Sequence, residues 1–223
     1  MSAWIRRFWP LLLLLFLQGL FMAWPLGDLQ VSAAFYSAPD GFVLADSWLA
    51  GLVGMVFGNL HIVLLLILPW LMLASAYWGG AAETQMRTRL YFLFLVVALA
   101  PGLAVGILEA ESGRAHPVDV QSFAGEQRFT AAFQPARECV DHCSFVSREA
   151  ASGFALLAFA WVLGDRRWIR IGVAAGAAVG AVQIAAGEHF LSDVIFAFWI
   201  VYGVSLGAAR LLLGDTRVQP ATG

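Results

Sequence analysis

Lysine is absent from the 223-residue sequence, and all 13 basic residues are arginine. Charged residues of either sign are scarce as well: they make up 13% of the chain, against about 25% in an ordinary soluble domain. Hydrophobic residues make up 61%, and the mean hydropathy is +0.78. This composition excludes a soluble globular enzyme, a disordered chain and a nucleic-acid-binding protein. It indicates a protein with most of its surface in lipid, and one whose chemistry uses no lysine side chain.

Six apolar stretches reach or approach the roughly 20 residues that a membrane-spanning helix needs. They cover residues 8–24, 53–77, 90–108, 150–163, 171–186 and 194–213. We therefore predict an all-α integral membrane bundle of about six helices, built as a single domain over residues 1–213 with a short tail over 214–223. Arg6 and Arg7 precede the first stretch, as in a signal peptide. The stretch is nevertheless long for a signal peptide and has no convincing cleavage site after it, which favours an uncleaved helix.

The arginines are distributed unevenly between the two sides of the predicted bundle. Nine of the 13 lie near the N-terminus, in alternate loops or near the C-terminal end, and such a bias marks the cytoplasmic side. The other side holds four arginines and most of the acidic residues. The bias predicts a multi-pass protein of a bacterial inner membrane, with both termini in the cytoplasm and the loop over residues 109–149 in the periplasm.

The only two cysteines, Cys139 and Cys143, lie in that predicted periplasmic loop. In an oxidising compartment a disulfide is the default state of such a pair. A metal site formed with His142, or a pair of free thiols, stays open as an alternative. Covalent haem attachment is excluded, because Ser144 rather than histidine follows the second cysteine.

Polar residues gather where three of the predicted helices end on the periplasmic side. The three segments are 109–117, 144–149 and 183–193, and ionisable residues near membrane depth are candidates for a functional site. In the third segment, His189 and Asp193 are four residues apart. On a helix this spacing would let the carboxylate orient the imidazole. Spacing alone favours a pair that only caps and solvates the start of the helix.

The motifs in these segments resemble those of the type-2 phosphatidic acid phosphatase family, which is related to vanadium haloperoxidases. The run over residues 187–194 resembles the third family motif, residues 143–147 resemble the start of the second, and residues 113–120 resemble the end of the first. The bacterial lipid A 1-phosphatase branch is the nearest resemblance. The order of the motifs and their placement between helices agree with the family along nearly the whole chain.

The resemblance implies a six-helix membrane fold with a periplasmic phosphate site and a lipid phosphate as substrate, without a cofactor. It implies that His189 is the nucleophile, that Asp193 orients it, and that Ser147 binds phosphate. Five family positions differ in this chain. Glu109 replaces a lysine, His116 and Gln183 each replace an arginine, Arg148 replaces a glycine, and Glu149 replaces the histidine that serves as general acid.

Some of the lost functions could be supplied by other residues of the chain. Arg148 and Arg114 could provide positive charge for a phosphate, and a protonated His116 could bind an oxyanion. Glu149 could donate a proton if burial raised its pKa. With no lysine in the sequence, nothing elsewhere in the chain can restore the missing lysine.

Three hypotheses follow for the function. The first is a diverged lipid-phosphate phosphatase or phosphotransferase that acts through His189. The second is an inactive family member that binds a lipid or serves as the accessory subunit of a membrane complex. The third is a metal site formed by the glutamate and histidine side chains of the cluster, including Glu109, His116, Glu149 and His189.

Overall fold

The computed structural model describes residues 3–77 and 81–219, and these residues are predominantly helical. The long helices are α1 (Ala3–Ala23), α3 (Trp48–Tyr77), α4 (Ala81–Val97), α8 (Arg167–Ala186) and α9 (Leu191–Leu212). Among the described residues, four helical spans are long and apolar enough to cross a membrane. A fifth is added if α1 and α2 (Leu26–Ala33), which meet at an angle of 83°, count as one span. The predicted all-α membrane fold is confirmed.

The third predicted span is a single helical unit with a distorted middle. It comprises α4, the π-helical turn η1 (Ala98–Ala104) and α5 (Val105–Ser112). Pro101 lies within the π-helical turn. Because proline has no N–H to donate to the preceding turn, it accounts for the local departure from α-helical geometry.

The fourth predicted span is divided into three short segments and does not qualify as a long apolar helix. It consists of α6 (Arg148–Phe154), η4 (Ala155–Ala158) and α7 (Phe159–Leu163). Residues Ala150 to Phe154 of α6 are all buried. This helix packs closely on α8, where a Cβ on Gly153 would come within 2.9 Å of the Gly176 backbone. The adjoining η4 is also close, since a Cβ on Gly172 of α8 would come within 2.2 Å of the Leu157 backbone. Small residues at Gly153, Gly172 and Gly176 thus allow these segments to pack closely.

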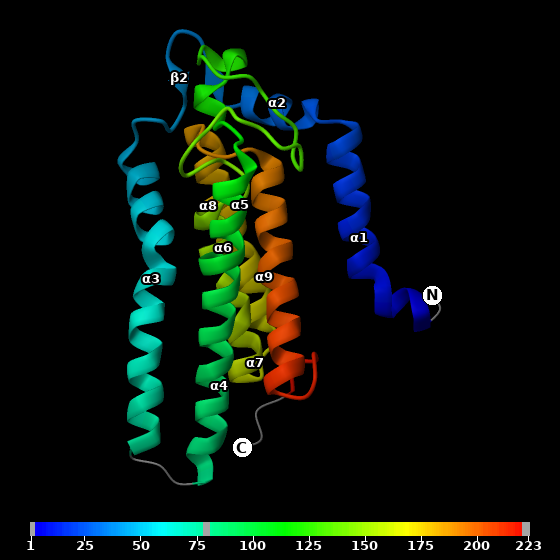
Figure 1. Cartoon of the computed structure of the whole chain (residues 1–223), viewed down its shortest axis with the longest axis vertical. Helices are drawn as coiled ribbons and strands as arrows, with labels where there is room; N and C mark the ends of the chain where they lie inside the picture. Colours follow the sequence, from blue (N-terminus) through cyan, green and yellow to red (C-terminus); the bar gives the residue numbers. More distant parts are fainter. Residues whose placement is uncertain (1–2, 78–80, 220–223) are drawn as a thin grey trace.

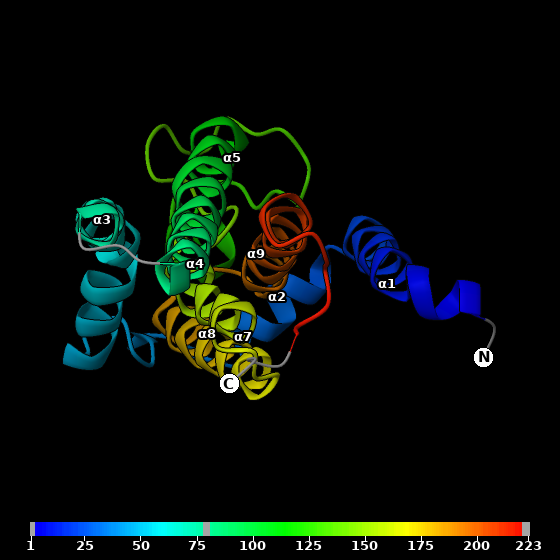
Figure 2. The ribbon, with the colours of Figure 1, turned by 90° about the horizontal axis from the view of Figure 1, so that it is seen from below.

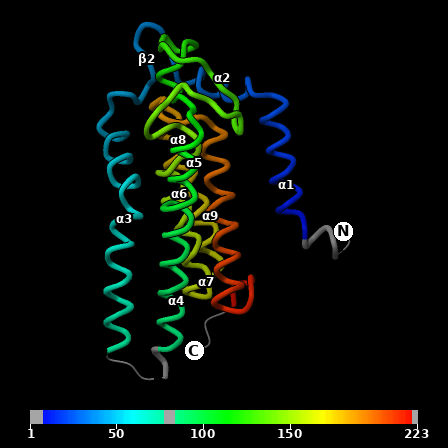
Figure 3. Tube along the Cα trace, viewed as in Figure 1, coloured from blue at the N-terminus to red at the C-terminus, as the bar shows by residue number. Residues whose placement is uncertain are grey.

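The helices form a bundle with α3 at one edge, and α1 lies apart from the bundle on the opposite side (Figures 1 and 2). The end of α9 lies toward the lower end of the bundle in Figure 3, and the long loops that follow α2 and α5 gather at the upper end. These loops include a small hairpin of β1 (Tyr36–Ser37) and β2 (Gly41–Phe42) and the single turns η2 (Pro117–Asp119) and η3 (Gln121–Phe123).

The first part of the predicted C-terminal tail packs against the bundle. The indole Nε1 of Trp161 donates a hydrogen bond to the Thr216 carbonyl at 3.0 Å, and Val218 is buried. Residues 220–223 of that predicted tail lie outside the described residues. The folded region thus extends several residues beyond the predicted domain end at residue 213.

Candidate active site

The three polar segments meet in one cavity of about 330 Å³ at the loop end of the bundle. Its walls come from α3, the end of α5, the start of α6, the end of α8 and the loops before α6 and α9. Six of the residues proposed from sequence line it: Glu109, His116, Arg148, Glu149, Gln183 and His189. The structure therefore brings together side chains that lie up to 80 positions apart in the sequence.

His189 is held in place by a tight turn at the end of α8. Gly187 closes that helix with a φ of 78°, a conformation that glycine adopts at little cost. A Cβ at this position would come within 2.5 Å of the Phe42 ring, so packing also requires glycine. The turn leaves His189 in the loop just before α9, with only 4% of the residue exposed.

The two nitrogens of the His189 ring have different partners. Nδ1 lies 2.8 Å from the Ser144 carbonyl oxygen, which can only accept, so Nδ1 carries a hydrogen and donates it. Nε2 faces the cavity and lies 3.0 Å from the Glu149 carboxylate. Asp193 Oδ2 lies 3.8 Å from Nδ1, which is too long for a hydrogen bond. The expectation that Asp193 directly accepts the imidazole N–H is therefore wrong, because the Ser144 carbonyl takes that place.

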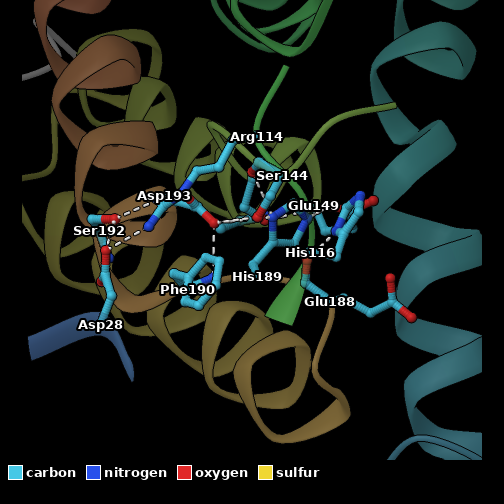
Figure 4. Close-up of polar contacts among 12 residues, drawn as sticks. Asp28, Arg114, His116, Ser144, Glu149, Glu188, His189, Phe190, Ser192 and Asp193 are labelled. Carbon is cyan, nitrogen blue, oxygen red and sulfur yellow. Dashed lines mark hydrogen bonds and ion pairs between the residues drawn. The ribbon is translucent and has the colours of Figure 1, made fainter. Parts of the chain in front are cut away.

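Asp193 instead belongs to a buried ionic network with Arg114 and Asp28, drawn in Figure 4. Its carboxylate accepts hydrogen bonds from Arg114 (2.5 Å), the Ser144 hydroxyl (2.5 Å) and the backbone N–H of Phe190 (2.7 Å). Arg114 also pairs with Asp28 of α2 at 2.8 Å. The two aspartates are 0% exposed and Arg114 is 1% exposed. Asp193 thus holds Phe190, the residue that follows His189, and Ser144, whose carbonyl contacts the His189 ring.

Neither Arg114 nor Ser147 is among the residues that line the cavity. The Arg114 guanidinium is occupied by the two aspartates, Ser192 Oγ and the Thr130 carbonyl, and it stacks 4.2 Å above the centre of the Phe190 ring. The Ser147 hydroxyl is fully buried and caps α6 by accepting the Ala150 N–H. Arg114 is therefore engaged away from the cavity, contrary to the expectation that it provides positive charge for a phosphate. The Ser147 hydroxyl also donates a hydrogen bond to the Glu149 carboxylate at 3.3 Å, and its contact with phosphate stays a prediction.

His116 and Arg148 line the cavity but already have partners. Both ring nitrogens of His116 face carbonyl oxygens, those of Glu188 and His142. Neither nitrogen is therefore free to bind an oxyanion, contrary to the expectation from the sequence. Arg148 forms an ion pair with Glu109, although its Nε has no hydrogen-bond partner among the described residues. Gln183 is buried and contributes a neutral amide.

Asp28 is a site residue that the sequence reasoning missed. It accepts hydrogen bonds from the backbone N–H and the hydroxyl of Ser192 at 2.9 and 2.6 Å, and so connects α2 to the start of α9. A single acidic residue in an otherwise apolar segment was the available signal. Its partner Arg114 lies 86 positions away, and spacing along the chain cannot reveal such a contact.

The two cysteines form a disulfide, which closes a short loop next to Ser144. Because the Ser144 carbonyl holds His189, this bridge constrains the segment that positions the ring. Among residues 3–77 and 81–219, no group of three or more His, Cys, Asp or Glu side chains is arranged to hold a metal ion. Both hypotheses of a metal site, at the cysteines and at the glutamate–histidine cluster, therefore lack support.

Opposing effects decide the protonation of the His189–Glu149 pair. Burial alone would lower the pKa of His189, but Asp193 and Glu149 outweigh it and raise that pKa to about 10. Burial alone would raise the pKa of Glu149, but the hydrogen bond and charge of His189 outweigh it and lower that pKa to about 2. The expectation that Glu149 has a raised pKa is wrong: at neutral pH the proton resides on His189.

Replacing Glu149 with glutamine is expected to lower the pKa of His189 from about 10 toward its ordinary 6.5, because one of its two counterions is lost. In the wild type, the ion pair stabilises the fold fully between about pH 4.5 and 6.5. This stabilisation declines as the pH rises from 6.5 through 10, because the unfolded chain loses its histidine proton first. It also declines as the pH falls from 4.5 through 2.

Histidine resonances followed by NMR in detergent micelles measure the pKa, and thermal melts across this pH range measure the stability. The difference in melting temperature between wild type and Glu149→Gln should be largest between pH 4.5 and 6.5 and should shrink toward pH 10. The control variant is Glu111→Gln, since Glu111 is exposed on α5 outside the cavity. A difference that does not vary with pH would contradict the assigned charges.

Comparison with known proteins identifies a family. The PAP2 superfamily model matches residues 89–217, which include most of the cavity. The chain is 28% identical over 204 residues to "Lipid A 4'-phosphatase" of Francisella tularensis subsp. novicida, covering 82% of this chain and 88% of the relative. Proteins of the same name from Rhizobium etli (32%, 75% of this chain, 67% of the relative) and Rhizobium leguminosarum (30%, 91% and 93%) are also similar. No solved structure matches.

These matches confirm the resemblance to the phosphatidic acid phosphatase family and to its lipid A phosphatase branch. The names of the three relatives specify the 4'-phosphate, whereas the motifs had suggested the 1-phosphatase type.

Proposed function

The chain belongs to the PAP2 superfamily, and we propose that it is a membrane lipid phosphatase that acts on a lipid phosphomonoester through His189. The observation that carries this proposal is the placement of the His189 ring. The Ser144 carbonyl fixes the hydrogen on Nδ1, and Nε2 faces a cavity large enough for a phosphate head group. The names of the three relatives support a lipid phosphate as the substrate.

In this proposal, Glu149 carries the proton that the reaction has to move. When the phosphate binds, the Nε2 proton passes across the 3.0 Å contact to the Glu149 carboxylate. Nε2 then attacks phosphorus, the bond between phosphorus and the lipid oxygen breaks, and Glu149 returns the proton to that oxygen. The products of this step are the lipid alcohol and a phosphohistidine.

The second half of the reaction reverses these roles. Glu149, again a carboxylate, removes a proton from a water molecule, whose oxygen attacks phosphorus as the bond to Nε2 breaks. Inorganic phosphate leaves and Nε2 recovers its proton from Glu149. Arg148 is the cation of the cavity that can contact the phosphoryl oxygens, since its buried Nε has no partner among the described residues.

The direct test is phosphate release from a panel of lipid phosphates by wild type and Glu149→Gln. Glutamine keeps the size of the side chain but cannot carry the proton, so turnover should fall by about 10²- to 10⁴-fold, as for other general acid–base residues. Glu111→Gln serves as the matched control and should retain wild-type turnover. Equal turnover of wild type and Glu149→Gln would reject the proposed role of Glu149.

A second candidate is a catalytically inactive member that binds a lipid or a partner membrane subunit. It is favoured by the pairing of every cation in the cavity: Arg148 with Glu109 and His189 with Glu149. Removing these pairs to admit phosphate has an energetic cost that a lysine- and arginine-rich site would not have. Retained lipid or subunit binding, with a cellular phenotype unchanged in His189→Ala, would support this alternative. Strict dependence of the phenotype on His189 would reject it.

We further propose that the protein resides in a bacterial inner membrane, with its cavity on the periplasmic side and both termini in the cytoplasm. The arginine distribution supports this orientation, and the end of α9 lies toward the end of the bundle opposite the cavity loops (Figure 3). The disulfide next to the cavity agrees with an oxidising periplasm.

A further inference from the structure

A second polar cavity, of about 320 Å³, lies at the end of the bundle opposite the candidate active site. Its walls come from the first half of α4, from α7, from the end of α9 and from the tail that follows α9. These segments meet at the lower end of the bundle in Figure 1. Within the described part of the chain, this cavity shares no lining residue with the candidate active site. It is therefore a separate feature of the molecule.

The tail that follows α9 forms one wall of this second cavity because it is held against the bundle. The indole of Trp161 lines the cavity and donates its hydrogen bond to the Thr216 carbonyl at 3.0 Å. Val218, two residues further on, is buried. The wall is thus part of the folded structure, although the sequence predicts a tail from residue 214 onward.

The second cavity carries more positive than negative charge. Its charged lining residues are Arg89, Arg217 and Asp215. The Asp215 carboxylate is already engaged, since it accepts hydrogen bonds from the backbone N–H of Arg217 at 3.0 Å and from the side-chain amide of Gln219 at 2.8 Å. Arg217 is near enough to Asp215 for their charges to attract. Neither guanidinium, however, forms a hydrogen bond or an ion pair with another residue that the structure describes.

This arrangement differs from that of the candidate active site, where Arg148 and His189 are each paired with a glutamate. An anion that enters the second cavity finds two guanidinium groups without having to break an ion pair. Guanidinium groups match the geometry of phosphate oxygens, with which they form short charge-assisted hydrogen bonds. The ligand class that fits the charge of the cavity is therefore a phosphate-bearing anion.

The other lining residues indicate that this phosphate belongs to a lipid. Leu212, Leu213 and Trp161 give the cavity an apolar wall, while Gln85 and Gln219 add side-chain amides. The cavity also lies beside the ends of two membrane spans, at the depth where lipid head groups are found. A soluble anion has no use for the apolar wall, whereas the glycerol and first methylene groups of a phospholipid can pack on it. Basic pockets between helices at the cytoplasmic side are typical binding sites for anionic head groups.

We propose that this second cavity binds the head group of an anionic phospholipid. The phosphate contacts Arg89 and Arg217, and the apolar part of the head-group region packs on Leu212 and Leu213. In the orientation proposed above, the lipid comes from the cytoplasmic leaflet of the membrane. The site does not take part in the proposed phosphatase reaction, because it lies at the other end of the bundle. Bound lipid connects α4, α9 and the tail, so it should also raise the melting temperature of the protein.

The test measures lipid binding to the purified full-length protein in an uncharged detergent. Phosphatidylglycerol is the anionic probe, and phosphatidylcholine with the same acyl chains is the control without net charge. Inorganic phosphate and glycerol 3-phosphate distinguish a soluble anion from a lipid. Affinities are measured calorimetrically and melting temperatures in parallel. The variants are the double variant Arg89→Gln/Arg217→Gln and the control Arg170→Gln, since Arg170 is an exposed arginine near the start of α8 that does not line the cavity.

Wild type, Arg170→Gln and His189→Ala should bind phosphatidylglycerol about tenfold more tightly than phosphatidylcholine. In Arg89→Gln/Arg217→Gln this ratio should fall below about threefold, and each single variant should give an intermediate ratio. Without added lipid the double variant should melt within a few degrees of wild type, because neither guanidinium has a partner in the described fold. A lost preference then reports the lost site and not unfolding.

Three results would overturn the inference. The first is equal binding of the two lipids by wild type, or a ratio that is unchanged in the double variant. The second is a preference that disappears in His189→Ala, which would place the lipid in the candidate active site. The third is binding of inorganic phosphate or glycerol 3-phosphate as tight as that of phosphatidylglycerol, which would show a site for a soluble anion.

Discussion

Replacing Arg114 with methionine is expected to prevent stable folding. Methionine fills a similar volume, but the change leaves Asp28 and Asp193, both 0% exposed, without their shared counterion. Breaking a buried ion pair by removing one partner costs about 3–5 kcal/mol, a large share of the roughly 5–15 kcal/mol that stabilises a typical protein. Here two carboxylates lose their partner at once. Thermal melting and the yield of monodisperse protein in detergent measure the effect.

Two further variants separate the loss of this ion network from a general effect of arginine replacement. Arg137→Met, at an exposed position of the same loop region, should leave the melting temperature within a few degrees of wild type. Adding Asp28→Asn and Asp193→Asn to Arg114→Met removes the uncompensated charges and should recover part of the lost stability. A melting temperature of Arg114→Met equal to that of Arg137→Met would show that the buried network does not stabilise the fold.

Replacing His189 with alanine is expected to lower phosphate release by about 10⁴-fold or more, since loss of a nucleophile removes the covalent route itself. His189→Gln should behave alike, because an amide can keep a hydrogen bond to the Ser144 carbonyl but cannot accept a phosphoryl group. Both variants should remain folded, as the Asp28–Arg114–Asp193 network does not include the imidazole as a hydrogen-bond partner. Phosphate release per folded molecule is the quantity to compare, and a loss below tenfold would reject a nucleophilic His189.

Much of the fold follows from residue types along the chain. Long apolar stretches predict helices in a membrane, because a helix satisfies its backbone hydrogen bonds within one segment where lipid offers no partners. The spacing of the polar segments at the helix ends also predicted that Glu109, His116, Glu149 and His189 meet, and they line one cavity. The division of residues 148–163 into short segments was not predictable, since it depends on close packing against α8.

The charge states of the site could not be predicted, because they depend on contacts between distant segments. The sequence offers Asp193 as the orienting group for His189, yet the carbonyl of Ser144, 45 positions earlier, occupies that place. The sequence suggests that Arg114 is available to bind phosphate, but its guanidinium is paired with two buried aspartates, Asp28 and Asp193. Burial suggested a protonated Glu149, whereas its contact with His189 moves the proton to the ring.

The absence of lysine restricts the source of positive charge in the cavity. A phosphate site without lysine has to take its positive charge from Arg148 and from the proton of His189, and both are paired with glutamates in the resting structure. The same proton that closes the His189–Glu149 pair is the one that the leaving group requires. In the proposed reaction, substrate binding therefore breaks the ion pairs and at the same time transfers the His189 proton to Glu149.

Trapping of the phosphoenzyme tests the central role of His189 most directly. Wild type is mixed with a radiolabelled lipid phosphomonoester, quenched in alkali, which preserves phosphohistidine, and digested for peptide mapping. The proposed reaction predicts label on the peptide that contains His189 in wild type and none in His189→Gln. Release of phosphate by wild type without label at His189, or label that persists in His189→Gln, would contradict it.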